Sequence, residues 1–189
     1  ERCQRAKSLS EVIVATDDMR IAEAAFAFGA AVSLTSSKHQ SGTDRIAEVA
    51  ARLRGFRHII NVQGDEPAVE PRLIDRLVHV LQNDLSLEMV TAASPFENES
   101  EAGNPNNVKV VTAQDGRALY FSRSRIPFPR DEPGSAASPL WHIGIYGYRR
   151  DFLARFVQWR ATPLERIERL EQLRALEQGV AIHVIRTLH

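Results

Sequence analysis

The stretch His58-Ile59-Ile60-Asn61-Val62-Gln63-Gly64-Asp65-Glu66-Pro67 changes abruptly from apolar to polar residues. Its first half is rich in β-branched side chains and is followed by turn-forming residues, which is typical of a buried strand. Gly64 allows a sharp turn, and Pro67 ends regular pairing. Asp65 and Glu66 therefore stand just past the carboxyl end of a strand, where open α/β sheets bind ligands. The ten residues alone leave a second interpretation open, a strand followed by a solvated acidic turn.

Strands and helices alternate on both sides of this stretch. Short runs at 12–15, 31–34 and 89–93 are expected as further strands. The alanine-rich residues 19–28 suit a helix, and the spacing of apolar residues predicts a helix at 43–54 and a third helix that opens at Pro71. Such a βαβαβαβ order predicts a parallel sheet that is covered on both faces.

The alternation breaks after Pro95. The runs 108–111 and 118–121 flank Asp115-Gly116, which predicts a β-hairpin, and four prolines make 127–139 a loop. A strand at 142–148, helices at 150–158 and 163–178, and a last strand at 182–185 complete the chain. We expect one domain, 1–189, in which 96–150 form an antiparallel excursion from a single core.

Composition and charge narrow the function classes. The 189 residues carry 24 basic and 24 acidic side chains, and no basic run, which argues against nucleic acid or an anionic membrane as the main partner. No apolar run approaches the roughly 18 residues of a membrane span, so we expect no membrane insertion. The single cysteine, Cys3, cannot form an internal disulfide, which fits a reducing compartment. No signal peptide is visible, and because the sequence opens at Glu1 rather than Met, we expect its N-terminus to be cut.

Several well-known catalytic motifs are absent from the sequence. No GxGxxG follows a strand, no GxxxxGK[ST] occurs, and neither HExxH nor GxSxG is present. The remaining chemistry consists of carboxylates, amides, arginines and histidines at loop positions. These side chains are suited to binding Mg²⁺ and phosphates, since Mg²⁺ binds a few carboxylates and completes its coordination shell with phosphate oxygens and water.

A second informative stretch is His39-Gln40-Ser41-Gly42-Thr43-Asp44-Arg45, which leads into the helix at 43–54. Ser41 or Thr43 would cap this helix, and Gly42 permits a ligand to approach the backbone. The free amides and the dipole of a helix N-terminus favour an anion, although a routine capped helix explains the same residues. Arg45 is unusual in a first turn, and we expect it to pair with Asp44, with Glu48 or with an anionic ligand.

Six collinear stretches carry a resemblance to a known family. They are HQSGTDRIAEV (39–49), IINVQGDEP (59–67), NPNNVKVV (104–111), ALYFSRSRIPF (118–128), HIGIYGYR (142–149) and PLERIERLEQLR (163–174). On these stretches the chain resembles the 3-deoxy-manno-octulosonate (Kdo) cytidylyltransferases. The resemblance implies an α/β fold with a Rossmann-like mixed sheet, the nucleotide-diphospho-sugar transferase fold. It also implies a cytoplasmic enzyme of lipopolysaccharide biosynthesis that forms a homodimer through the antiparallel excursion.

The resemblance further implies a reaction and a set of site residues. The anomeric hydroxyl of Kdo attacks the α-phosphate of CTP, which gives CMP-Kdo and pyrophosphate. Asp65 is the implied catalytic residue and Mg²⁺ ligand. The implied nucleotide-binding residues are Ser41, Gly42, Thr43, Arg45 and Gln63. The implied sugar-binding residues are Arg123, His142, Tyr146, Glu171 and Gln172.

The residues themselves support these assignments unevenly. Glu171 falls on the apolar stripe of the predicted helix 163–178, where a carboxylate needs a polar partner unless it reaches solvent at the rim. A guanidinium suits a sugar carboxylate, but spacing alone makes Arg125 as good a candidate as Arg123. A lone histidine such as His142 is more often structural. Strand alternation places Tyr146 on the same face as His142, Gly144 and Tyr148, opposite Ile143 and Ile145, although its ring could equally be core.

The chain also departs from the family pattern. The family opens with a strand and a phosphate-holding loop that are not found here, and its second acidic metal ligand would lie beyond His189. We therefore expect these 189 residues alone to be poorly soluble or oligomeric, with the edge of strand 12–15 unpaired, and inactive. Two alternatives stay open, a related nucleotidylyltransferase for sialic acid or amino-Kdo, and a non-catalytic remnant of the enzyme.

Overall fold

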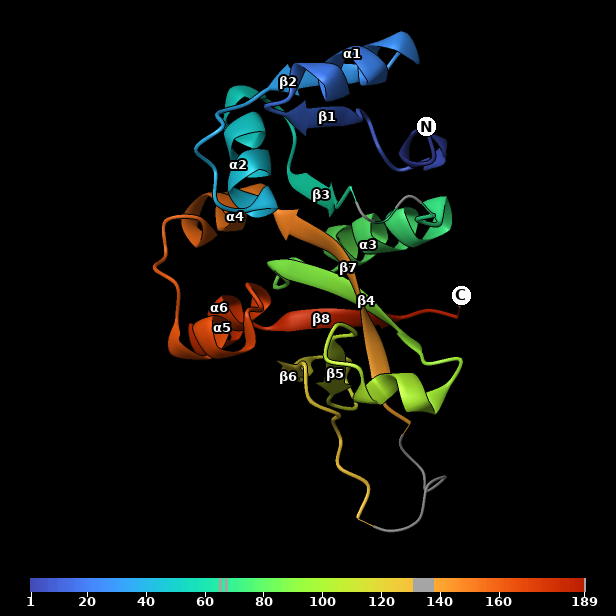
Figure 1. Cartoon of the computed structure of the whole chain (residues 1–189). Helices are drawn as coiled ribbons and strands as arrows, with labels where there is room; N and C mark the ends of the chain where they lie inside the picture. Colours follow the sequence, from blue (N-terminus) through green and yellow to red (C-terminus); the bar gives the residue numbers. More distant parts are fainter. Residues whose placement is uncertain (65, 67, 131–137, 189) are drawn as a thin grey trace.

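The computed structural model describes residues 1–64, 66, 68–130 and 138–188 (Figure 1). Its strands are β1 (Ile13–Thr16), β2 (Ala31–Leu34), β3 (His58–Val62), β4 (Met89–Pro95), β5 (Lys109–Thr112), β6 (Ala118–Ser122), β7 (Leu140–Arg149) and β8 (Ile182–Arg186). Its helices are α1 (Met19–Ala27), α2 (Gly42–Arg52), α3 (Pro71–Asn83), α4 (Arg150–Phe156), α5 (Pro163–Glu168) and α6 (Gln172–Glu177), with 3-10 turns at Cys3–Arg5 and Glu99–Gly103. Every strand expected from the sequence is present.

The larger sheet forms around β7, its longest strand. Along its whole length β7 pairs antiparallel with β4, and on its other side it pairs with β5 near its start and with β3 near its end. β8 extends the sheet parallel to β4, and β6 lies antiparallel beside β5. The mixed sheet that the family resemblance implied is confirmed.

The prediction of one parallel sheet through the first four strands is wrong. β7 lies between β3 and β4, while β1 and β2 form a separate parallel pair. Figure 1 shows this pair with α1 at one end of the molecule. Gly147 explains why β7 fits there, because a Cβ at this position would come within 2.8 Å of Val90 and 2.9 Å of Leu81. β7, which is far from β3 and β4 in the sequence and contains Gly147, thus lies between them. The local order of strands and helices had predicted that β3 and β4 would pair within one parallel sheet.

The predicted hairpin after Pro95 is confirmed. β5 and β6 pair antiparallel, and the turn between them contains Gly116 with φ +85°. An L side chain rarely adopts this conformation, so glycine is required at the turn. Leu119 of β6 is 62% exposed, since β6 lies at the edge of the sheet.

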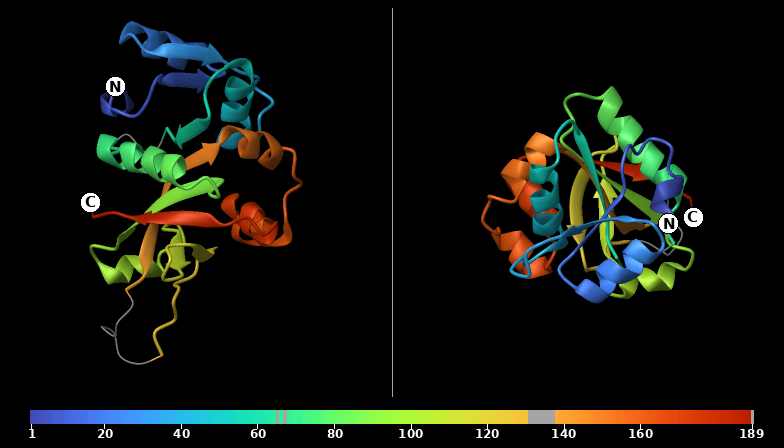
Figure 2. Two further views of the ribbon diagram at one scale, coloured as in Figure 1. Left: turned by 180° about the vertical axis from the view of Figure 1, so that it is seen from behind. Right: turned by 90° about the horizontal axis from the view of Figure 1, so that it is seen from above.

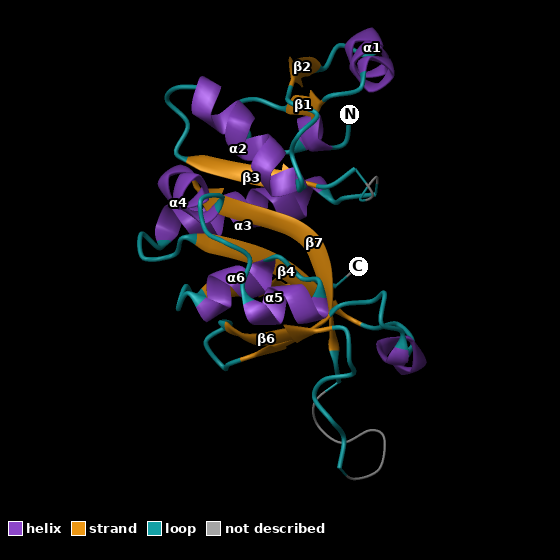
Figure 3. Cartoon of the chain, turned by 60° about the vertical axis from the view of Figure 1, so that its left-hand side comes forward, coloured by secondary structure: helices purple, strands orange, loops and turns teal. Residues whose placement is uncertain are grey.

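The larger sheet separates two apolar clusters. On one face, side chains of β4 and β7 such as Met89 and Tyr148 pack with α2, α4 and α6. On the other face, Val90, Ile143 and Ile145 pack against α3 and the N-terminal turn. Figure 2 shows the two groups of helices on opposite sides, and Figure 3 shows α6 beside β6. The candidate site residues of β7 lie on the first of these faces.

The predicted helix 163–178 is broken into α5 and α6. Arg169 adopts a left-handed conformation with φ 56°, and it ends α5. The break allows Leu170 and Leu173 to be buried while Ile167 of α5 remains 78% exposed. The prediction of one continuous helix is wrong because the spacing of apolar residues gives no signal for this left-handed turn. The packing of Leu170 stabilises the turn.

Among the described residues, no helix is both long enough and apolar enough to cross a membrane.

Candidate active site

The N-terminus of α2 meets the turn between α5 and α6. Ser41 is the cap of α2, and its hydroxyl accepts a hydrogen bond of 3.1 Å from the Asp44 amide. The next hydroxyl, on the buried Thr43, donates a hydrogen bond to Glu171. Two of the residues implied for the nucleotide thus lie against a residue implied for the sugar acid, although they are separated by more than 120 positions in the sequence.

Glu171 stands just before the first residue of α6, so the premise that it lies on a continuous helical stripe is wrong. Burial raises the pKa of this carboxyl, although the Thr43 hydroxyl and the guanidinium of Arg174, 3.5 Å away, act in the opposite direction. Ser41 also acts to lower the pKa of this carboxyl. The result is an enclosed carboxylate whose partners come from two distant segments.

Arg174 connects Glu171 to a second buried carboxylate. Its Nε and Nη2 atoms donate to the two carboxylate oxygens of Glu165 at 2.9 and 2.6 Å, and only 11% of each side chain is exposed. Burial alone would raise the pKa of Glu165, but hydrogen bonds from Arg174 and from the Thr162 amide lower it. The spacing of residues in the sequence pointed to neither Glu165 nor Arg174 as a site residue.

His142, Tyr146 and Tyr148 form a row of rings on one face of β7. Ring centroids lie 5.4 Å apart for His142 and Tyr146, and 5.9 Å apart for Tyr146 and Tyr148. The alternation predicted for this strand is therefore confirmed, since Ile143 and Ile145 belong to the opposite cluster. Burial lowers the pKa of His142 to about 3, so the imidazole is neutral at physiological pH, and burial raises the pKa of both tyrosines.

This row of rings reaches the N-terminus of α2. Thr43 acts against the raised pKa of Tyr148, and the charge of Glu171 contributes to the raised pKa of both Tyr146 and Tyr148. Strand alternation had placed Tyr148 on this face without assigning it a role. Gln172, the first residue of α6, is buried as well.

The side chain of Arg123 connects neighbouring loops through hydrogen bonds to their backbone. Its guanidinium donates to the backbone carbonyls of Glu168 at 2.7 Å, Pro105 at 3.0 Å and Arg169 at 3.3 Å. The buried Lys109 donates in turn to the carbonyl of Arg123. Arg123 is therefore anchored to the segment that leads to Glu171, and its contact with a sugar carboxylate stays a prediction.

Arg45 pairs with Asp17, not with Asp44 or Glu48. Its Nη1 atom lies 2.9 Å from Asp17 Oδ1 and donates at 2.6 Å to the hydroxyl of Thr35. The arginine thus connects the first turn of α2 to the segments that follow β1 and β2.

Gly42 and Gln63 approach each other closely. A Cβ on Gly42 would lie 2.9 Å from Oε1 of Gln63, so the two quoted sequence stretches come together at this point. The positions predicted for the nucleotide are thereby neighbours in space.

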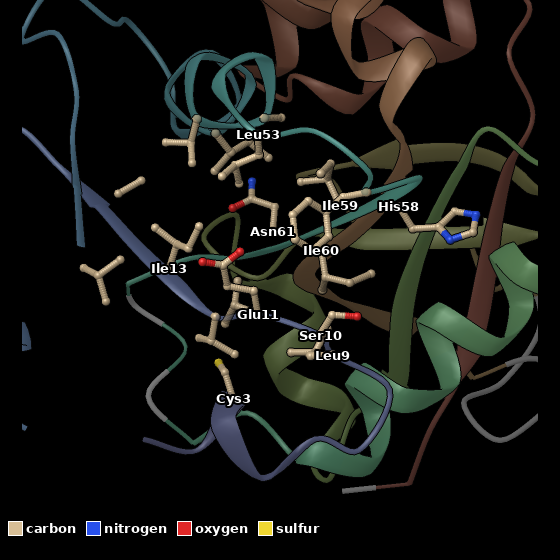
Figure 4. A pocket seen from close by; sticks show the side chains of 18 of the residues that line it. Cys3, Leu9, Ser10, Glu11, Ile13, Leu53, His58, Ile59, Ile60 and Asn61 are labelled. Atoms are coloured by element: carbon tan, nitrogen blue, oxygen red, sulfur yellow. The ribbon is translucent and has the colours of Figure 1, made fainter. Parts of the chain in front are cut away.

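A cavity of 1070 Å³ opens beside these residues, between β1 and β3. Gly42, Arg45 and Gln63 line it together with apolar side chains. Figure 4 shows Asn61 of β3 between Ile13 of β1 and Leu53 at the end of α2. Asn61 is buried, and its amide nitrogen has no hydrogen-bond partner among the described residues. Residues of β1 border this cavity, and among the described strands β1 pairs only with β2.

Asp65, the predicted catalytic residue and metal ligand, lies outside the described residues. Its neighbour Glu66 is described, and a Cβ on Gly144 of β7 would lie 3.9 Å from Oε1 of that glutamate. Within the described part of the chain, no group of three or more His, Cys, Asp or Glu side chains could hold a metal ion.

Comparison with known proteins decides the family. Residues 1–182 match the family model described as cytidylyltransferase. The chain belongs to the cytidylyltransferase family. The 3-deoxy-manno-octulosonate cytidylyltransferase of Geobacter sulfurreducens is 48% identical over 198 residues, which cover all of this chain and 79% of that relative. The enzyme of the same name from Fusobacterium nucleatum is 47% identical over 98% of this chain and 76% of its own length.

Solved structures agree with this family assignment. A CMP:2-keto-3-deoxy-manno-octonic acid synthetase complexed with CTP superposes with a TM-score of 0.93 at 39% identity. The superposition covers the whole of this cytidylyltransferase chain and 76% of that one. A 4-diphosphocytidyl-2C-methyl-D-erythritol synthase from Anaerococcus prevotii shares the fold, with a TM-score of 0.59 at 11% identity.

Proposed function

We propose that this cytidylyltransferase transfers CMP from CTP to the anomeric hydroxyl of Kdo and releases pyrophosphate. The hydrogen bond between Thr43 and Glu171 is the observation that carries the proposal, because it joins the segment implied for the nucleotide to the segment implied for the sugar acid. The relatives named as Kdo cytidylyltransferases, and the related synthetase complexed with CTP, supply the identity of the two substrates.

The nucleotide is proposed to bind where Gly42, Arg45 and Gln63 border the cavity. The first turn of α2 offers free amides and the positive end of the helix dipole to phosphate oxygens. Arg45 adds a guanidinium that Asp17 and Thr35 hold in place. Nucleotidyl transfer depends mainly on positioning and on charge neutralisation, and these groups supply both.

The sugar acid is proposed to bind beside the ring row of β7. Glu171 and the neutral His142 offer acceptors to sugar hydroxyls, and Tyr146 and Gln172 flank them. Arg123 is proposed to donate hydrogen bonds to the sugar carboxylate. A guanidinium carries five N–H groups, so its contacts with three backbone carbonyls leave N–H groups available.

Mg²⁺ is proposed as the cofactor, with Asp65 as its protein ligand. The donor set fits this ion, since Mg²⁺ needs only one or two carboxylates when substrate phosphates complete its shell. When bound, the ion would neutralise phosphate charge.

A homodimer in the cytoplasm completes the proposal. β6 presents an edge that pairs only with β5 among the described residues, and Leu119 and Phe128 of the excursion are 62% and 85% exposed. An exposed strand edge with apolar side chains favours association with a second copy.

Pyrophosphate release by the full-length protein, in the presence of CTP, Mg²⁺ and a panel of sugar acids, tests the proposed function. We expect release with Kdo and at most slow release with sialic acid or amino-Kdo. Faster release with either of those acids would favour the related nucleotidylyltransferase. If calorimetry shows Mg-CTP binding but no sugar acid supports release, the chain is a binding remnant.

A further inference from the structure

Thr91 lies at the centre of β4 and is fully buried. Its hydroxyl oxygen is 2.7 Å from the carbonyl oxygen of Ile145, 3.3 Å from that of Ile143 and 3.0 Å from Nε2 of His142. The register between β4 and β7 shifts at Thr91 and Ala92. Such irregularities often re-aim a side chain beside an active site. The irregularity brings two carbonyls of β7 and one imidazole to a single hydroxyl.

The positions of the protons follow from these distances. Two oxygen atoms 2.7 Å apart need a proton between them, and a backbone carbonyl has none to give. The single proton of the Thr91 hydroxyl therefore points to Ile145, and its oxygen is left to accept from His142. Since the Thr91 oxygen accepts from His142 at 3.0 Å, Nε2 of His142 must carry a proton.

The other nitrogen of His142 then carries no proton. The imidazole is neutral, because burial lowers its pKa to about 3, and a neutral imidazole has one N–H and one bare nitrogen. No described residue forms a hydrogen bond with Nδ1, and this atom is not among the fully enclosed polar atoms that lack a partner. The ring stands between Phe121, with centroids 5.0 Å apart, and Tyr146.

We propose that Thr91 is a positioning residue that holds His142 in the Nε2–H tautomer, so that Nδ1 presents an acceptor to a hydroxyl group of the sugar acid. The identity of this ligand rests on the proposed function, whereas the tautomer rests on the contacts of Thr91 and on the burial of the imidazole. An acceptor at this position selects for a substrate with a donor there, because a buried acceptor left unpaired weakens binding.

Nitrogen-15 NMR of the imidazoles measures the tautomer directly. In the wild-type chain we expect one protonated and one bare nitrogen on His142, with the proton on Nε2, and the resonances are assigned by their loss in His142→Gln. Thr91→Val keeps the shape of the side chain and removes the hydroxyl, so its spectrum should shift towards a mixture of tautomers. Thr91→Ser keeps the hydroxyl and should restore the wild-type spectrum.

Kinetics provide the second readout. Thr91→Val should raise KM for Kdo about tenfold, as expected for the loss of one well-placed hydrogen bond, with KM for CTP changed less than about twofold. Thr91→Ser should remain near wild type. Thr112→Val is the matched control, since this β5 threonine accepts from Arg186 at 2.9 Å, away from His142, and its kinetics and His142 spectrum should not change.

Each failure has a different meaning. A wild-type spectrum with the proton on Nδ1, or with both nitrogens protonated at pH 7, overturns the proposal even if Thr91→Val does not fold. A raised KM for CTP, or an unchanged KM for Kdo in a folded Thr91→Val, overturns the positioning role. Absence of any Kdo-dependent turnover in the wild-type full-length protein overturns the proposed function and the assigned ligand, while the tautomer is still decided by the spectrum.

Discussion

Thr43, in the first turn of α2, donates a hydrogen bond to Glu171, which stands between α5 and α6. This contact joins two segments that are far apart in the sequence, and it places a carboxylate against the N-terminus of a helix. A helix N-terminus stabilises negative charge, while burial opposes it, and the raised pKa of Glu171 shows that burial prevails. The first predictions concern this carboxylate.

Replacement of Glu171 separates the sugar side of the site from the nucleotide side. Glu171→Ala should raise KM for Kdo by tenfold or more, because hydrogen bonds to a charged acceptor contribute about 1.5–3 kcal/mol. The Kd for Mg-CTP, measured by calorimetry, should change less than about threefold. A large loss of CTP binding with KM for Kdo unchanged would assign Glu171 to the nucleotide instead.

The raised pKa of Glu171 predicts a pH dependence of stability. The folded state holds this proton more tightly than the unfolded state, so the contribution of Glu171 is fully present below the unfolded pKa of about 4.5 and is lost as pH rises through the folded pKa. Glu171→Gln should remove this loss and be more stable than wild type at pH 7. Urea unfolding at a series of pH values measures both curves. A variant that is less stable than wild type at pH 7 contradicts the sign.

Removal of Arg174 should destabilise the fold. Arg174→Met leaves the buried carboxylate of Glu165 without its partner, so the free energy of unfolding should fall by about 3 kcal/mol. Arg155→Met is the control, because the ion pair of Arg155 with Glu88 is half exposed, and its loss should cost less than about 1 kcal/mol. Equal effects of the two substitutions on the free energy of unfolding in urea would show that the buried Arg174–Glu165 pair stabilises the fold no more than the half-exposed pair does.

Asp65→Asn tests the proposed metal ligand. The substitution keeps the shape of the side chain and removes its charge, so turnover should fall by about a hundredfold or more with little change in unfolding free energy. Asp115→Asn, in the exposed turn between β5 and β6, is the control and should keep wild-type turnover. Near wild-type pyrophosphate release from Asp65→Asn, at limiting Mg²⁺, would remove Asp65 from the site.

Leu119→Lys tests the proposed dimer. A charge on the exposed edge strand β6 disfavours pairing with a second copy. We expect sedimentation equilibrium to give a dimer for the wild type and a monomer for the variant, with an unchanged circular dichroism spectrum. Ile167→Lys, at an apolar position on α5 that is 78% exposed, serves as the control and should stay dimeric. A dimer that survives Leu119→Lys would place the contact elsewhere.

The sequence by itself determined most of the local structure. The β-branched run at 58–62 is a strand, Ser41 is a helix cap and Asp115-Gly116 is a hairpin turn, each because short-range sterics and hydrogen bonding decide it. Alternation along β7 correctly placed His142 and Tyr146 on one face, since side chains of a strand point to opposite sides in turn.

Only the tertiary structure decided which of these elements meet. No periodicity indicates that β7 lies between β3 and β4, because strand partners are chosen by packing across the sheet, here around Gly147. The left-handed turn at Arg169 likewise depends on the burial of Leu170. That turn brings Glu171 to Thr43 and Arg174 to Glu165. The local sequence gives no signal for these contacts, because they are stabilised by the pairing of buried polar groups that meet only when the chain folds.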